Sequence, residues 1–144
     1  MRHLRISTEG AIIRGDLEVP DSPVGVVLFA HGSGSGRLSS RNQFVARELN
    51  ARGLATLLID LLTEDEEVAE RDSRHLRFDI GLLVDRLSAS TRWLEQDSAT
   101  SMLPIGYFGA STGAAAALGA AVHFPSRVVA VVSRGGRPDL AGDA

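Results

Sequence analysis

Residues 105–118 read Ile-Gly-Tyr-Phe-Gly-Ala-Ser-Thr-Gly-Ala-Ala-Ala-Ala-Leu, and this stretch decides the fold. An apolar segment typical of a buried strand runs into the pentapeptide 109–113, and an alanine-rich segment typical of a helix follows at once. The pattern G-x-S-x-G between a strand and a helix predicts a sharp turn with the serine exposed at its tip. Gly109 and Gly113 suit such a turn because strained backbone leaves no room for bulky neighbours.

The turn predicts chemistry as well as shape. Ser111 is the candidate nucleophile, since its hydroxyl would stand at the carboxyl end of the sheet. The Thr112 amide, at the start of the following helix, is placed to face a developing oxyanion. A plainer interpretation stays open, because small residues also fill ordinary tight turns between a strand and a helix.

A second loop carries a related signal. Residues 24–30 form a continuous apolar run, which predicts a strand buried on both faces, and His31-Gly32-Ser33-Gly34 follows it. A tetrahedral oxyanion needs two converging backbone donors, and the Ser33 or Gly34 amide can supply the second one. We expect His31 to fix this loop by hydrogen bonding.

The same glycines admit a nucleotide-binding interpretation, with Asp60 at the end of the next strand. If Gly32 and Gly34 are the first two glycines of a dinucleotide fingerprint, the third position falls on Arg37, which is too large for helix–strand contact. A phosphate-binding P-loop would need a lysine, and all fifteen basic residues of this chain are arginines. The sequence disfavours nucleotide binding.

The order of elements predicts an α/β fold with a mostly parallel sheet, an N-terminal antiparallel hairpin and helices on both faces. The hairpin covers residues 4–7 and 11–19, and further strands are expected at 24–30, 55–60, 105–108 and 128–132. One helix, with a capping box at Ser40 and Gln43, ends at Gly53, and another covers residues 76–95. Residues 63–74 are acidic and are expected to form a surface loop with some helical turn.

Composition indicates one globular domain over residues 1–144. Hydrophobic residues make up 44% and charged residues 23%, and no apolar run is long enough for a membrane span. The net charge of −3, without a basic stripe, argues against a nucleic-acid partner. The chain has no cysteine and no cluster with metal-ligand spacing, so we expect no metal, no cofactor and a cytoplasmic location.

Together, the hairpin, the His-Gly loop after residues 24–30 and the Gly-Ala-Ser-Thr-Gly turn resemble the α/β-hydrolase superfamily, and most of all its dienelactone-hydrolase-like members. The resemblance covers residues 4 to about 140. It implies a mostly parallel eight-stranded sheet and hydrolysis of a small-molecule ester or lactone. By position, Ser111 matches the nucleophile, and Thr112 and Ser33 match the oxyanion-hole amides.

The resemblance also implies a catalytic acid and then a histidine after the serine. After Ser111 the chain offers only Asp139 and Asp143 as carboxylates and only His123 as a histidine. His123 precedes both aspartates and falls near the far end of the predicted helix, about 18 Å from the serine. We therefore expect no base for Ser111 in this chain, and turn chemistry accounts for Asp139.

Six strands are predicted, so the chain resembles the N-terminal two-thirds of such a domain, apparently truncated after the sixth strand. Residues 128–132 would then form an apolar sheet edge, open to self-association, to a partner or to further chain. A non-catalytic binding module of the same fold stays an alternative. The substrate-binding residues are unknown; Arg37 and Arg134 follow strands and could hold an acidic substrate, although a surface role is expected for them.

Overall fold

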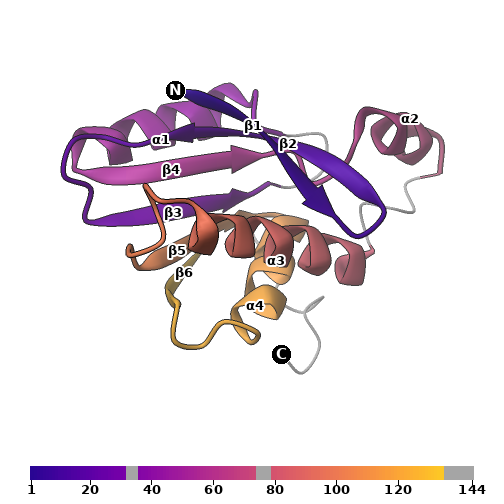
Figure 1. Ribbon diagram of the computed structural model, residues 1–144. Helices are drawn as coiled ribbons and strands as arrows, with labels where there is room; N and C mark the ends of the chain where they lie inside the picture. Colours follow the sequence, from indigo (N-terminus) through magenta and orange to yellow (C-terminus); the bar gives the residue numbers. More distant parts are fainter. Residues whose placement is uncertain (32–35, 74–78, 135–144) are drawn as a thin grey trace.

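The structure is a computed structural model that describes residues 1–31, 36–73 and 79–134 (Figure 1). Six strands form one sheet in the order β1-β2-β4-β3-β5-β6. The hairpin of β1 and β2 is antiparallel and joins β4 in an antiparallel pair, whereas the other four strands run parallel. The strands are β1 (Arg2–Thr8), β2 (Ala11–Glu18), β3 (Gly25–Ala30), β4 (Leu54–Ile59), β5 (Ile105–Ala110) and β6 (Val128–Arg134). The predicted fold class is confirmed.

Helices cover both faces of the sheet (Figure 1). Helix α1 (Ser40–Ala51) packs on one face, where Phe29, Ala46 and Leu58 form a small buried cluster. Helices α3 (Ile80–Gln96) and α4 (Thr112–Ala121) lie over the larger core on the other face. Strand β3 contributes side chains to the cores on both faces of the sheet: Leu28 belongs to the larger core and Phe29 to the smaller one. This two-sided burial is the reason for its continuous apolar run.

Residues Glu64–Ser73 form helix α2, so the expectation of a surface loop there is wrong. A capping box starts this helix: the Thr63 amide donates to Glu66 Oε1 at 2.8 Å, and the Glu66 amide donates to Thr63 Oγ1 at 3.2 Å. Four acidic residues in the first turn also favour the positive end of the helix dipole. Polarity indicated a loop, but the capping chemistry produces an exposed helix.

Two other helix starts differ from prediction. Helix α1 is capped by Ser39, whose side chain accepts from the Asn42 amide, and not by Ser40. Helix α3 begins at Ile80, after Asp79 caps it by accepting from the Leu82 amide at 3.0 Å. Residues 76–78 of the expected helix lie outside the described residues. Helix α1 ends at Ala51 rather than at the predicted Gly53, and Gly53 just beyond it has a φ of 87°, the left-handed conformation that favours glycine after a helix.

Strand β6 lies at one edge of the sheet, as predicted, and β5 is its only partner among the described residues. Its side chains are unusually open for an apolar strand, with Val129 68% and Val132 53% exposed. The opposite edge is β1, which is polar on its outer face.

Within the described ranges, no helix combines the length and apolarity that crossing a bilayer requires.

Candidate active site

The turn between β5 and α4 consists of a single residue. Strand β5 ends at Ala110, helix α4 begins at Thr112, and Ser111 between them has φ 57° and ψ −128°. Few non-glycine residues adopt a positive φ, and this region of backbone space costs about 1–3 kcal/mol. Ser111 is partly exposed. The structure therefore places the predicted serine at the tip of a strained turn.

The two glycines of the motif are required by close backbone contacts. A Cβ atom on Gly109 would lie 2.6 Å from Ala114 Cα. A Cβ atom on Gly113 would overlap the carbonyl oxygen of Ala30 and reach within 2.5 Å of the His31 oxygen. Helix α4 thus starts directly against the end of β3, and only glycine permits this approach.

The amides around the turn have different roles. The Ser111 amide donates to the Arg134 carbonyl at 3.3 Å, so it extends the pairing of β5 with β6. No side chain caps helix α4, and no described residue accepts from the Thr112 amide. Thr112 itself is only 4% exposed. A free amide at a helix N-terminus, beside a partly exposed hydroxyl, is suited to binding a negative charge.

His31 follows β3 and is buried, with 6% exposure. Its Nε2 accepts a hydrogen bond from the Leu61 amide at 2.8 Å, which assigns the ring proton to Nδ1 in the neutral form. The bond joins the end of β3 to the segment after β4. His31 is therefore anchored at the end of β3. Gly32, Ser33 and Gly34 lie outside the described residues, so the role of His31 in fixing the loop stays a prediction.

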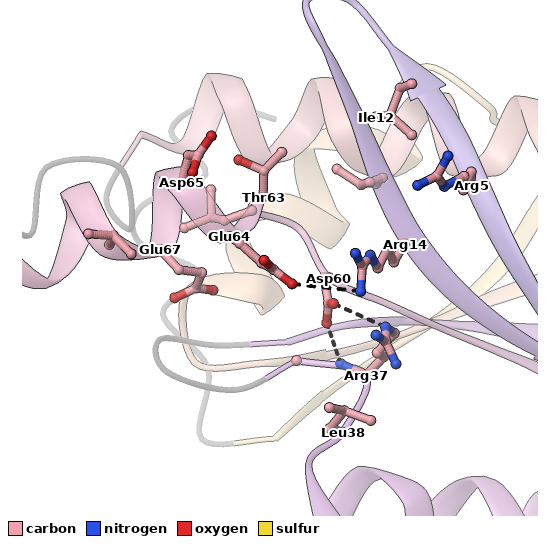
Figure 2. A pocket seen from close by; sticks show the side chains of 14 residues that line it. Arg5, Ile12, Arg14, Arg37, Leu38, Asp60, Thr63, Glu64, Asp65 and Glu67 are labelled. Atoms are coloured by element: carbon pink, nitrogen blue, oxygen red, sulfur yellow. Dashed lines mark hydrogen bonds and ion pairs between the residues drawn. The ribbon is translucent and has the colours of Figure 1, made fainter.

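The far side of this loop is held by Asp60. Its carboxylate accepts from the Arg37 amide at 2.8 Å and pairs with Arg37 Nε at 3.1 Å (Figure 2). A Cβ atom on Gly36 would lie 2.5 Å from Asp60 Oδ1, so the chain passes close to the carboxylate. Arg37 also reaches Asp16 at 3.4 Å and is largely buried. The expected surface role of Arg37 is therefore wrong, and Asp60 is already engaged rather than free for a ribose.

His123 and Ser111 lie at opposite ends of helix α4, with Ser111 before its first residue and His123 two residues after its last. The His123 side chain is exposed. Asp139 and Asp143 lie outside the described residues, and so does His75. No histidine other than His31 is buried near the described strand ends, and His31 Nε2 is engaged by Leu61. No metal-binding group of three occurs within the ranges that the structure describes.

A pocket of about 760 Å³ opens between the β1–β2 hairpin, the segment after β4 and helix α2 (Figure 2). Arg5 and Arg14 line it from the hairpin, and Glu64 lines it from α2. Neither Ser111 nor Thr112 is among its lining residues. The pocket lies beyond the carboxyl end of β4, and β3 separates that strand from β5.

The contact that fixes the α2 wall of this pocket has no signal in the sequence. Arg86, 3% exposed on α3, forms a bidentate pair with Glu66 at 2.7 and 2.8 Å and also donates to the Leu61 carbonyl. These bonds to Arg86 are the main reason that the pKa of Glu66 is lowered to about 2. The capping motif Thr63-x-x-Glu66 was visible in the sequence, but its partner twenty residues away was not.

Comparison with known proteins places this geometry in context. No protein-family model matches the chain. A crystal structure of dienelactone hydrolase from Anabaena variabilis matches 97% of this chain and 65% of its own, with a TM-score of 0.93 and 56% identity. Two more distant structures share the fold. An esterase of Pyrococcus furiosus has a TM-score of 0.74 and 19% identity, and the match covers 94% of this chain and 50% of the esterase. A dienelactone hydrolase-like promiscuous phosphotriesterase from metagenomic libraries has a TM-score of 0.72 and 17% identity, over 94% of this chain and 58% of that protein.

A protein of Mycobacterium tuberculosis that carries the provisional name phosphoribosyl transferase is 57% identical over 132 residues. The match covers 92% of this chain but 29% of that protein. The chain therefore spans less than a third of this curated relative and about two-thirds of the dienelactone hydrolase.

Proposed function

The chain has the α/β-hydrolase fold and resembles dienelactone hydrolase over nearly its whole length, and from this premise we propose that it carries the nucleophile of a serine hydrolase. The substrates are carboxylic esters or lactones. In the reaction, Ser111 Oγ attacks the carbonyl carbon, the carbonyl oxygen becomes an oxyanion, and the base of the triad takes the serine proton. The oxyanion collapses and the C–O bond to the alcohol breaks, with the proton passing to the leaving oxygen. Water then attacks the acyl-enzyme, releases the carboxylic acid and restores the serine.

The backbone of Ser111 is the observation that carries this proposal. A non-glycine residue at φ 57° and ψ −128° persists only where the surroundings enforce it. Gly109 and Gly113 supply those surroundings, since each packs against backbone at a distance that excludes a side chain. A plain tight turn between a strand and a helix has no need of such strain. The strain therefore favours a nucleophile over a purely structural turn.

Two amides stabilise the oxyanion in this proposal. The Thr112 amide points out of the start of α4 with no acceptor among the described residues. Ser33, which follows His31 in the chain, supplies the second donor in this proposal. Such preorganised donors are worth about 2.7–4 kcal/mol each when removed singly from serine hydrolases of known mechanism.

The base and the acid of the triad come, in this proposal, from outside these 144 residues. His123 is separated from Ser111 by the whole of α4, and the chain spans 65% of the dienelactone hydrolase. Without a base, a serine hydroxyl is a weak nucleophile. We therefore expect the 144-residue chain alone to hydrolyse simple esters feebly, and any form of the protein that also supplies the base and the acid to hydrolyse them well.

The name of the mycobacterial relative gives no second candidate function. It belongs to a protein of which the matched segment is 29%, and no feature of the described residues points to phosphoribosyl transfer. Nucleotide binding also has no support here, since Arg37 engages the Asp60 carboxylate.

Labelling of the full-length protein with a fluorophosphonate probe tests the proposal. The probe should modify Ser111, and Ser111→Ala should abolish the label while the protein stays folded. Ser126→Ala is the matched control, because Ser126 is an exposed serine in the turn before β6 and should not affect labelling. Labelling that survives in Ser111→Ala would refute the assignment.

A further inference from the structure

Two arginines stand directly opposite each other on the hairpin. Arg5 of β1 pairs in register with Arg14 of β2, so both side chains lie on the same face, and both are exposed. Like charges in directly opposed positions destabilise a pair of strands. Such a pair is readily explained where an anion lies between the two guanidinium groups.

Asp65 and Glu67 of α2 also line the pocket, but neither forms an ion pair with Arg5 or Arg14 among the described residues. Arg14 reaches one carboxylate, Glu64, at 3.6 Å, and that side chain is 85% exposed. Arg5 has no carboxylate within ion-pair distance in the described ranges. Arg37, close by, is already neutralised by Asp16 and Asp60. Only Arg14 of this pair therefore has an ion-pair partner, and that partner is loosely held.

The same two arginines line the pocket of about 760 Å³, and a smaller one of about 420 Å³ adjoins it. Ile12, Leu38 and Val68 also line the large pocket, and each of these apolar side chains is more than half exposed. In Figure 2, Arg14 and Glu64 face each other across the space between the hairpin and α2. The volume falls in the range of small-molecule sites, about 300–1,000 Å³.

The walls of the pocket are held by partly buried contacts. Helix α2 is tied to α3 by the bidentate Glu66–Arg86 pair, and the Arg37 wall is fixed by Asp60. These contacts leave the exposed Arg14–Glu64 pair as the weakest polar link across the opening, because exposed pairs contribute little. A ligand can displace Glu64 without disturbing the fold.

We infer that this pocket binds a small molecule with an apolar body and an oxyanionic group, a carboxylate or a phosphate, held between Arg5 and Arg14. The guanidinium groups donate charge-assisted hydrogen bonds to the oxygens, and Glu64 moves aside. Ile12, Leu38 and Val68 cover the apolar body. Glu64 thus competes with the ligand for Arg14, whereas Arg5 and Arg14 attract it.

Calorimetric titration of the full-length protein tests this inference with 4-phenylbutyrate and its neutral analogue 4-phenylbutyramide. The acid should bind at least tenfold more tightly than the amide. Arg5→Gln and Arg14→Gln should each weaken binding of the acid about tenfold, a change that corresponds to about 1.4 kcal/mol. Arg41→Gln is the matched control, since Arg41 is an exposed arginine on α1 outside the pocket, and it should leave binding unchanged.

Glu64→Gln gives the sharpest outcome. If Glu64 competes with the ligand, its removal should tighten binding of the acid several-fold, while Arg14→Gln weakens it. If the Arg14–Glu64 pair is merely structural, both substitutions should change the affinity for the acid in the same direction, and that result would overturn the inference. Equal affinity for the acid and the amide would overturn it too, and so would the absence of binding at millimolar concentration by both 4-phenylbutyrate and a second anion, phenyl phosphate.

Phenyl phosphate in place of 4-phenylbutyrate distinguishes the two kinds of anion. Tighter binding of the phosphate assigns the site to phosphorylated molecules, and tighter binding of the acid assigns it to carboxylates. Because these titrations measure binding alone, their failure would leave the proposed hydrolase function of Ser111 untouched. Loss of fluorophosphonate labelling would equally leave the pocket intact.

Discussion

The Ser111 turn and the arginine-lined pocket both lie at the carboxyl ends of parallel strands, the turn after β5 and the pocket beyond β4. They are built in different ways. Apart from the end of β3 and the Arg134 carbonyl of β6, the residues that shape the turn lie within 109–114, and the contacts there are between backbone atoms. The pocket draws its walls from the hairpin, the segment after β4 and helix α2, and side chains hold them together. A strained turn is therefore encoded locally, whereas a pocket depends on pairs far apart in the chain.

The largest expected effect comes from closing the space at Gly113. In Gly113→Ala, the new methyl group would overlap the carbonyl oxygens of Ala30 and His31, and backbone atoms cannot move aside as a flexible side chain does. We expect a loss of more than about 3 kcal/mol in the free energy of unfolding, measured by urea denaturation.

Gly106→Ala is the matched control for that change. Gly106 lies on β5, and its new methyl group would meet its nearest neighbour, the Ala130 oxygen, at an ordinary 3.7 Å. The cost there should stay below about 1 kcal/mol. Similar losses in both variants would contradict the close packing of α4 against β3 and would weaken the contrast between the two regions.

The Ser111 turn and the sheet could be predicted from sequence because their signals are short-range. A buried strand shows as a continuous apolar run, and the turn shows as glycines at fixed spacing around Ser111. The strand order at the β6 edge followed from the predicted topology. Helix α2 was missed because its polarity indicates a loop when the capping box at Thr63 and Glu66 is overlooked.

Residues of the pocket could not be predicted for a different physical reason. The sequence alone suggests that Arg37 is a surface residue. In the structure it is largely buried, because it contacts Asp16, 21 positions earlier, and Asp60, 23 positions later. Arg86 occupies the apolar face of α3 and is tolerated there only because Glu66 neutralises it. No local pattern reports which carboxylate will meet which arginine after folding.

An intermediate effect is expected from the Arg86–Glu66 pair, which fixes the pocket wall. Arg86→Met should reduce the free energy of unfolding by about 3 kcal/mol at neutral pH, because it leaves the Glu66 carboxylate and the Leu61 carbonyl without their donor. Arg14→Gln is the comparison, since it breaks an exposed pair and should cost less than about 0.5 kcal/mol.

The same pair predicts a pH dependence whose sign follows from the lowered pKa. The pKa of Glu66 is about 2 in the folded chain against an ordinary value of 4.5, mainly through the bonds from Arg86. Its stabilising contribution is therefore complete above the ordinary value and is lost as the pH falls from about 4.5 to about 2. Urea denaturation across this window should show a steeper decline in the wild type than in Arg86→Met. Equal declines in the free energy of unfolding of the two proteins would contradict the attribution of the lowered Glu66 pKa to Arg86.

The smallest expected effect, and the one with the opposite sign, concerns the strain at Ser111. Glycine adopts φ 57° and ψ −128° more readily than serine, so Ser111→Gly should relieve the turn. Glycine also adds entropy to the unfolded chain, which offsets part of this gain. We expect a net increase of about 1 kcal/mol in the free energy of unfolding, together with complete loss of fluorophosphonate labelling. Ser126→Gly, in a turn without a positive φ, should lose stability and keep the label. A loss of stability in Ser111→Gly would mean that the turn is relaxed and that the contrast between a strained site and a conventional pocket does not hold.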